Sequence, residues 1–83
     1  MSKRVVVYRK PSCVPCQGVK QWLESKGIPY EEVSAFDNPD AARIAKIRSV
    51  PTTVLMDGAD EVGRVVGLKA ELMQDVFGYG TAG

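Results

Sequence analysis

Two cysteines with two residues between them stand near the start of the chain, at Cys13 and Cys16, and the sequence contains no others. They follow an apolar run over residues 5–8 and precede a segment with helical periodicity. A close cysteine pair between a strand and a helix, in a chain without an export signal, is typical of thiol–disulfide exchange. The spacing therefore predicts a redox-active dithiol on the first turn of a helix.

The expected position of each cysteine assigns its role. Only the thiolate is nucleophilic, and an ordinary cysteine with a pKa near ~8.5 is largely protonated at neutral pH. At a helix N-cap, the Cys13 thiolate would be stabilised by the free amides of the first turn and by the helix dipole. Lys10 adds a positive charge nearby. We expect Cys13 to attack a substrate disulfide, and the less exposed Cys16 to close the intramolecular bridge.

Composition limits the classes of protein to consider. The chain has 83 residues, enough for one small domain, and its 11 basic and 10 acidic residues give a net charge of +1. Without a basic stripe, nucleic acid is not an expected partner. The basic N-terminus precedes only four apolar residues, so we expect a monomeric cytoplasmic protein that neither spans nor binds a membrane. In a reducing compartment a lone cysteine pair favours catalysis or metal binding over a permanent cross-link.

The apolar pattern predicts one domain over residues 1–77, followed by a flexible tail over 78–83. Strands are expected over 5–8, 28–33, 53–56 and 62–66, and helices over about 13–26, from 37–40 onwards and over 69–77. The first and third strands are apolar on both faces, as in the centre of a covered sheet. The second should lie at an edge, parallel to the first through a right-handed crossover. The expected fold is therefore α/β, a four-stranded mixed sheet with helices on both faces.

The two later helices are predicted to bury short apolar faces. The face of the second helix consists of alanine and isoleucine side chains, namely Ala42, Ile44, Ala45 and Ile47. In the last helix, the residues expected to face the sheet are Leu72 and Val76, with Met73 and Phe77 beside them.

Motifs spread over the chain resemble those of one known family. They are Lys10-Pro11-Ser12-Cys13-Val14-Pro15-Cys16, Gly27-Ile28-Pro29-Tyr30, Ser49-Val50-Pro51-Thr52, and Gly67 before the last helix. Over about residues 5–77 the chain resembles the thioredoxin fold in its minimal glutaredoxin-type form, and most of all the NrdH-redoxins, small glutaredoxin-like proteins with thioredoxin-like activity. The resemblance implies a thiol–disulfide oxidoreductase that reduces protein disulfides. It would hold no bound cofactor and would take electrons from NADPH through a reductase.

The resemblance also implies roles for single residues. In thioredoxin-like folds the proline at the place of Pro51 is cis and faces the dithiol, which leaves the backbone of Val50 free to pair with an extended substrate. Val14 and Gly67 are assigned to the same substrate-binding region. A proline before the second cysteine, as at Pro15, is similar to thioredoxin. It implies a reduction potential closer to that of thioredoxin, about −270 mV, than to the roughly −200 to −230 mV of glutaredoxins.

The identity of the reductant depends on a segment near the last helix. Glutaredoxins that bind glutathione have a glycine followed shortly by Ser/Thr/Cys-Asp, whereas this chain has Gly67-Leu68-Lys69-Ala70-Glu71. This difference predicts weak glutathione binding and thioredoxin reductase as the electron donor. The chain also departs from NrdH-redoxins, which usually have Gln at the place of Pro15 and Trp-Ser-Gly-Phe-Arg-Pro at residues 65–70. Ribonucleotide reductase is therefore one candidate client.

Two other interpretations of the cysteine pair stay open. One is a glutathione-dependent glutaredoxin, and the other is a zinc or iron–sulfur binding module. Zinc normally takes four ligands, and the chain has no histidine and no second cysteine pair. A metal site would therefore need a dimer that shares its thiolates, or carboxylate ligands, so no metal site is predicted within one chain.

Overall fold

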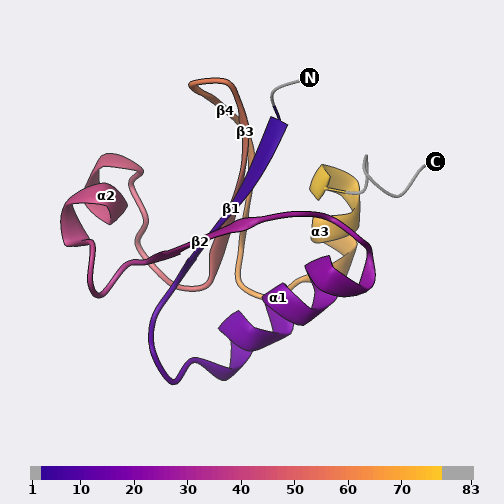
Figure 1. Ribbon diagram of the computed structural model, residues 1–83, viewed down its shortest axis with the longest axis horizontal. Coiled ribbons are helices and arrows are strands. Elements are labelled where there is room, and N and C mark those ends of the chain that lie inside the picture. The colour runs from indigo at the N-terminus through magenta and orange to yellow at the C-terminus, as the bar shows by residue number, and fades with distance from the viewer. Residues whose placement is uncertain (1–2, 78–83) are drawn as a thin grey trace.

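The computed structural model describes residues 3–77, and the predicted tail over 78–83 lies outside them. Seven elements occur in the predicted order (Figure 1). They are β1 (Lys3–Arg9), α1 (Val14–Ser25), β2 (Glu31–Ser34), α2 (Pro39–Ile44), β3 (Thr52–Asp57), β4 (Asp60–Val66) and α3 (Ala70–Phe77). The strand order is β2-β1-β3-β4, with β2 parallel to β1 and the other pairs antiparallel. The predicted four-stranded mixed sheet is confirmed.

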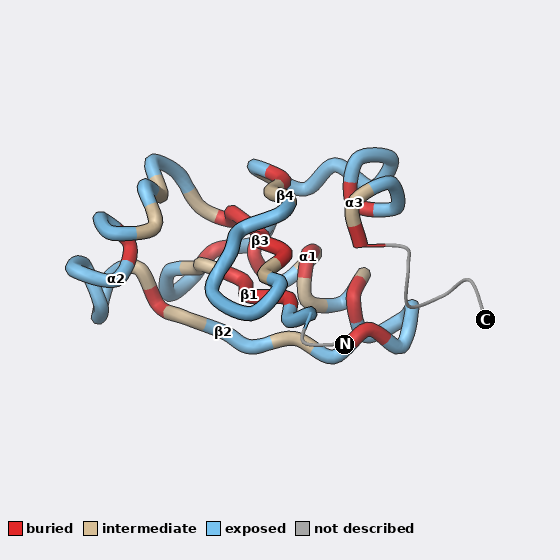
Figure 2. Tube along the Cα trace, turned by 90° about the horizontal axis from the view of Figure 1, so that it is seen from above, coloured by how far each residue is buried: buried red, intermediate tan, exposed pale blue. Residues whose placement is uncertain are grey.

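The two central strands are covered on both faces, as their apolar pattern predicts. Val5, Val6 and Val7 are all buried although they point alternately to opposite faces of β1. Helices α1 and α3 lie on one side of the sheet and α2 lies on the other (Figures 1 and 2). Burial therefore concentrates in the middle of β1 and in the first four residues of β3, while the outer strands carry more exposed residues (Figure 2).

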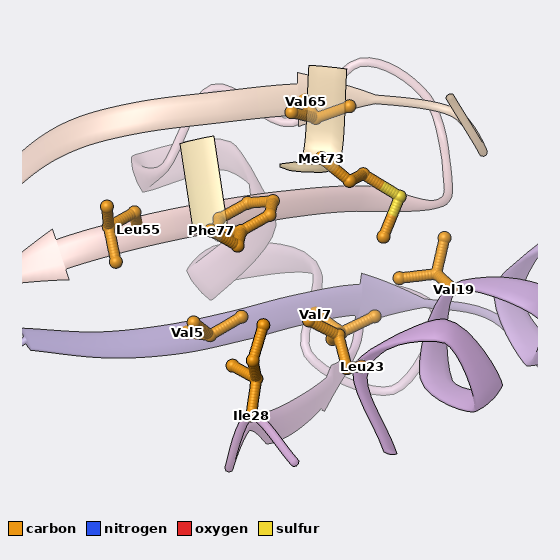
Figure 3. Packing of buried hydrophobic residues seen from close by; sticks show 9 residues of the cluster. All are labelled: Val5, Val7, Val19, Leu23, Ile28, Leu55, Val65, Met73 and Phe77. Atoms are coloured by element: carbon orange, nitrogen blue, oxygen red, sulfur yellow. The ribbon is translucent and has the colours of Figure 1, made fainter. Parts of the chain in front are cut away.

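One apolar cluster fills the space between the sheet and the helices α1 and α3 (Figure 3). Its buried members are Val5, Val7, Val19, Leu23, Ile28, Leu55, Val65, Met73 and Phe77. Removing an aliphatic or aromatic side chain of this size from water stabilises a fold by about 1.5–3 kcal/mol. Because Val19 and Leu23 belong to α1, this cluster fixes the helix whose first turn carries the cysteines.

Local sequence signals account for both ends of α1. Cys13 is the N-cap, with extended backbone angles, as expected. At the other end Gly27 adopts a φ of 70°, a conformation in which a residue without a Cβ is favoured. The amides of Gly27 and Ile28 then donate to the carbonyls of Glu24 and Leu23 at 3.1 and 3.0 Å. This is the Schellman arrangement, and it places Ile28 and Leu23 together in the core.

The second strand differs from its predicted span over 28–33. β2 begins only at Glu31, and Ile28 is a buried residue of the preceding loop. An apolar residue that packs below a helix end gives the same local pattern as the start of a strand, which explains the wrong boundary.

Two predicted core residues are exposed instead. Ile44 is 80% exposed, because α2 ends at that residue and is too short for a continuous apolar stripe. Only Ala42 of that helix is buried. Leu72 is 47% exposed, because the buried stripe of α3 runs through Met73 and Phe77, one residue further round the helix.

Candidate active site

The two cysteines form a disulfide across the first turn of α1, with their Cα atoms 5.2 Å apart. The amide of Cys16 donates a hydrogen bond to the Cys13 sulfur at 3.2 Å. Cys13 is 6% exposed and Cys16 only 1%. The structure thus confirms the predicted N-cap position, the pairing and the lower exposure of Cys16. In the reduced state the same amide would stabilise a thiolate on Cys13.

A tight turn brings the chain from β1 to the dithiol. Ser12, just before Cys13, has a φ of 58°, in the left-handed region that residues other than glycine seldom adopt. This turn directs the chain from the end of the central strand into the start of α1. Pro15 lies within the first helical turn, where a missing amide costs no intrahelical hydrogen bond.

Positive charge lies against one side of the disulfide. A small pocket of about 150 Å³ is lined by both cysteines together with Arg9, Lys10 and Lys20. The structure therefore places Lys10 beside the dithiol, as predicted; its effect on the Cys13 thiol stays a prediction.

Two of these three cations share one carboxylate, which no local sequence pattern predicts. Glu32 of β2 accepts hydrogen bonds from Arg9 Nε at 3.0 Å and from Lys20 Nζ at 3.3 Å. Burial opposes ionisation of this carboxyl, but the hydrogen bonds from Arg9 and Lys20 outweigh it and lower the pKa of Glu32. The side chains come from β1, α1 and β2, and they meet only because β1 and β2 are adjacent and parallel.

An open groove of about 610 Å³ lies at the start of α1, and we call it the client groove. Its walls come from α1, from the loop before β3 and from the loop before α3, and they include Val14, Pro15, Gly18, Val50, Pro51, Gly67 and Leu68. All four residues predicted to bind substrate, Val14, Val50, Pro51 and Gly67, therefore line one surface. Whether they bind substrate stays a prediction.

The loop before β3 has the predicted backbone. The peptide bond between Val50 and Pro51 is cis. The amide of Gly67, which has a φ of 85°, donates to the Pro51 carbonyl at 2.7 Å. This hydrogen bond connects the loop before β3 to the loop before α3, and both loops line the client groove.

Gly18 and Leu68 also line the client groove, although neither is among the predicted site residues. A Cβ on Gly18 would lie 2.6 Å from Leu68 Cδ2, so only a glycine lets Leu68 lie so close to α1. A signal for this face of α1 was present, since Val14, Gly18 and Gln21 follow the i, i+4, i+7 spacing. The contact itself joins residues fifty positions apart, and no local pattern indicates it.

Two other features bear on the alternatives. Within residues 3–77, no helix is long and apolar enough to cross a membrane. The same residues bring no group of three or more cysteine, histidine or acidic side chains together as metal ligands. A zinc site built on this pair would need ligands from elsewhere.

Comparisons with known proteins agree with this geometry. The family model "Glutaredoxin" matches residues 5–57. The SPbeta prophage-derived thioredoxin-like protein YosR of Bacillus subtilis (strain 168) is 32% identical over 75 residues, which cover 89% of this chain and 94% of YosR. The Gene 56 protein of Mycobacterium phage D29 is 27% identical over 82 residues, covering 94% of this chain and 87% of that protein.

The solved structures establish the fold. The short form of thioredoxin f from spinach chloroplast matches with a TM-score of 0.83 at 20% sequence identity, covering 98% of this chain and 78% of that one. The matched family segment contains both cysteines, and the structure joins them at the start of a helix. The chain therefore belongs to the glutaredoxin family and is a thiol–disulfide oxidoreductase with the thioredoxin fold.

Proposed function

We propose that this chain reduces disulfides of protein clients by a two-cysteine mechanism, in the manner of an NrdH-redoxin. The observation that carries the proposal is the position of the Cys13 sulfur, which caps α1 and receives the amide of Cys16. The client groove begins at the next residue, Val14. The nucleophile and a surface for an extended polypeptide thus adjoin each other.

The reaction starts from the reduced protein. The Cys13 thiolate attacks one sulfur of the client disulfide, so that a mixed disulfide forms while the client S–S bond breaks, and the departing client thiolate takes up a proton. The Cys16 thiol then loses its proton, and its sulfur attacks the Cys13 sulfur. The intramolecular disulfide forms as the disulfide between Cys13 and the client breaks, and the second client sulfur leaves as a thiolate that takes up a proton. Two electrons have passed to the client, and the protein ends in the disulfide state that the structure shows.

The chemistry of the client groove favours a polypeptide over glutathione. Among residues 3–77, none of those that line the groove carries a charge, and the only polar side chains in its lining are Gln17 and Gln21. Glutathione carries two carboxylates and one ammonium group, which require charged or amide partners when they are bound. An apolar groove beside the free backbone of Val50 suits an extended client segment instead.

The uncharged lining of the client groove also bears on the source of electrons, because it favours a protein reductant over glutathione. We propose that thioredoxin reductase, using NADPH, reduces the Cys13–Cys16 disulfide, and that the chain itself needs no bound cofactor. It would act in the cytoplasm as a monomer, with ribonucleotide reductase as one candidate client. A glutathione-driven cycle is the competing possibility.

Two coupled assays separate these cycles. Reduction of a disulfide protein is measured with NADPH and thioredoxin reductase, and again with glutathione, glutathione reductase and NADPH. We expect turnover in the first assay and little in the second. Turnover with glutathione alone would overturn the proposed reductant, while turnover in neither would overturn the proposed function.

Trapping assigns the two sulfurs. Cys16→Ser should accumulate a mixed disulfide with the client, because nothing resolves it, whereas Cys13→Ser should form none. A mixed disulfide in the Cys13→Ser protein alone would reverse the assigned roles. The metal content of the purified protein is measured on the same samples, because stoichiometric zinc or iron would favour the metal-binding alternative.

A further inference from the structure

A second groove lies on the other side of the Val50–Pro51 loop. It has a volume of about 380 Å³, and Val50 lines both this groove and the client groove. Its apolar lining comes from Ala35, Pro39, Ala42 and Ile47, and its charged lining comes from Arg43 and Arg48. We call it the arginine groove.

The arginine groove has an excess of positive charge. Arg48 is exposed and forms no ion pair in the part of the chain that the structure describes. Arg43 pairs with Asp40 at 2.9 Å, but the two side chains are 79% and 81% exposed. An ion pair so open to water contributes little, and a competing carboxylate can replace it. The described part of the chain contributes no acidic residue to the lining of the groove itself.

The chain as a whole does not have a comparable excess of positive charge. Its net charge is only +1, yet the residues that line the small pocket at the disulfide include three further cations, Arg9, Lys10 and Lys20. One carboxylate, that of Glu32, partly neutralises them. Basic side chains therefore line both the pocket at the disulfide and the arginine groove. Such a distribution attracts negatively charged partners and speeds their encounter.

The position of Val50 connects the two grooves. An extended client segment that pairs with the Val50 backbone would cross from one groove into the other. Successive residues of an extended chain advance by about 3.3 Å and point to alternate sides. A side chain only a few residues from the client cysteine would therefore reach the arginine groove.

We propose that the arginine groove is a second client subsite, and that it selects protein clients with aspartate or glutamate a few residues from their disulfide. This inference rests on the proposed function. The apolar lining beside two arginines fits an acidic polypeptide segment with some apolar side chains, since arginine binds carboxylates through paired hydrogen bonds.

The test uses two disulfide-containing peptides of identical sequence, except that residues flanking the cysteines are aspartate in one and lysine in the other. The ratio of kcat/KM for the acidic peptide to that for the basic peptide is measured at low and at high salt. We expect the acidic peptide to be preferred by about tenfold or more at low salt, and the preference to fall as salt rises.

Two charge variants locate the effect. Arg48→Gln should reduce the preference by about three- to tenfold. Arg4→Gln removes the same charge near the start of β1, where Arg4 pairs with Glu31 on the sheet surface. It should leave the preference unchanged within about twofold. The ratio is internal to each variant, so a partly unfolded sample does not change it.

The outcomes separate the two hypotheses. Equal kcat/KM for both peptides in the unsubstituted protein would overturn the subsite while leaving the proposed function intact. An equal loss of preference in Arg48→Gln and Arg4→Gln would also overturn it, because only net charge would then matter. If neither peptide is reduced while thioredoxin reductase still reduces the chain, the proposed function fails with it.

Discussion

Replacing Glu32 by glutamine should make the Cys13 thiol more acidic. The carboxylate accepts hydrogen bonds from Arg9 and Lys20, and both cations line the pocket that contains the two sulfurs. Glutamine keeps an oxygen for the two donors and removes the negative charge. The field at the dithiol then becomes more positive, which favours the thiolate over the thiol.

The size of the effect follows from Coulomb's law. Two unit charges about 8 Å apart, as across a small pocket, interact by about 0.5 kcal/mol in water and about 2 kcal/mol at the effective dielectric constant of ~20 near a protein surface. At 0.01 M ionic strength the Debye length is about 30 Å, so salt removes little of this energy. With 1.36 kcal/mol for each pKa unit, the pKa of Cys13 should fall by about 0.4 to 1.5.

The assay follows the rate of iodoacetamide alkylation against pH in a Cys16→Ser background, where only Cys13 can react. Glu31→Gln is the matched control. Glu31 precedes Glu32 on the same strand and pairs with Arg4, which does not line the pocket at the sulfurs. An unchanged or raised pKa of Cys13 in Glu32→Gln would refute the reasoning. A shift of equal size in Glu31→Gln would show that net charge alone is responsible.

The same variant should also change how stability depends on pH. Because the pKa of Glu32 is lowered in the folded protein, its ion pairs stabilise the fold above the unfolded pKa, near ~4.3, and this contribution disappears as the pH falls. The difference in urea midpoint between the unsubstituted protein and Glu32→Gln should therefore shrink between pH 7 and pH 4. A difference that grows on acidification would contradict the assigned pairing.

Three further changes test other parts of the structure. Gly18→Ala should alter the free energy of unfolding by less than about 1 kcal/mol, because the gain in helix propensity offsets the displacement of Leu68. It should raise KM for a protein client several-fold and leave the alkylation rate of Cys13 unchanged. An unchanged KM would show that Leu68 does not form the groove. Thr53→Val should stabilise the fold by about 1 kcal/mol in urea unfolding, since the Thr53 hydroxyl is buried without a hydrogen-bond partner among residues 3–77. A loss of stability would show that this hydroxyl has a hydrogen-bond partner in solution. The Tyr30 hydroxyl donates to Glu24, and this hydrogen bond raises the pKa of Tyr30 to about 12. An absorbance titration should therefore detect a tyrosine that ionises late, and Glu24→Gln should lower the pKa of Tyr30 towards ~10.

The features that could be predicted from the sequence depend on residues close together in the chain. Cys13 caps α1 and meets Cys16 within one helical turn, so their spacing alone indicates the geometry. Likewise Gly27 ends α1 through its own positive φ. The cis bond before Pro51 could be expected only from the family resemblance, because trans is the common state of X-Pro bonds.

The features that could not be predicted join distant segments or depend on how far neighbours cover a side chain. Glu32 lies 12 and 23 residues from the two cations that it accepts from, and only the pairing of β1 with β2 brings the three together. The exposure of Leu72 has a different cause. Helical periodicity predicts an apolar face about 100° wide. Which residues lie at the centre of that face depends on the strands beneath α3, and the helix sequence alone does not indicate this.

This difference in origin suggests that reactivity and client selection can be changed separately. The Cys13 sulfur accepts its hydrogen bond from the first turn of its own helix. The shape and charge of the grooves, by contrast, depend on loops such as those that carry Leu68 and Arg48. Substitutions in these loops should therefore change KM for protein clients without changing the rate at which a small uncharged reagent alkylates Cys13. Glu32 lines neither groove, so Glu32→Gln should change the alkylation rate of Cys13 and leave KM for an uncharged client unchanged. A variant of either kind that changed both quantities together would show that the helix start and the loops are coupled.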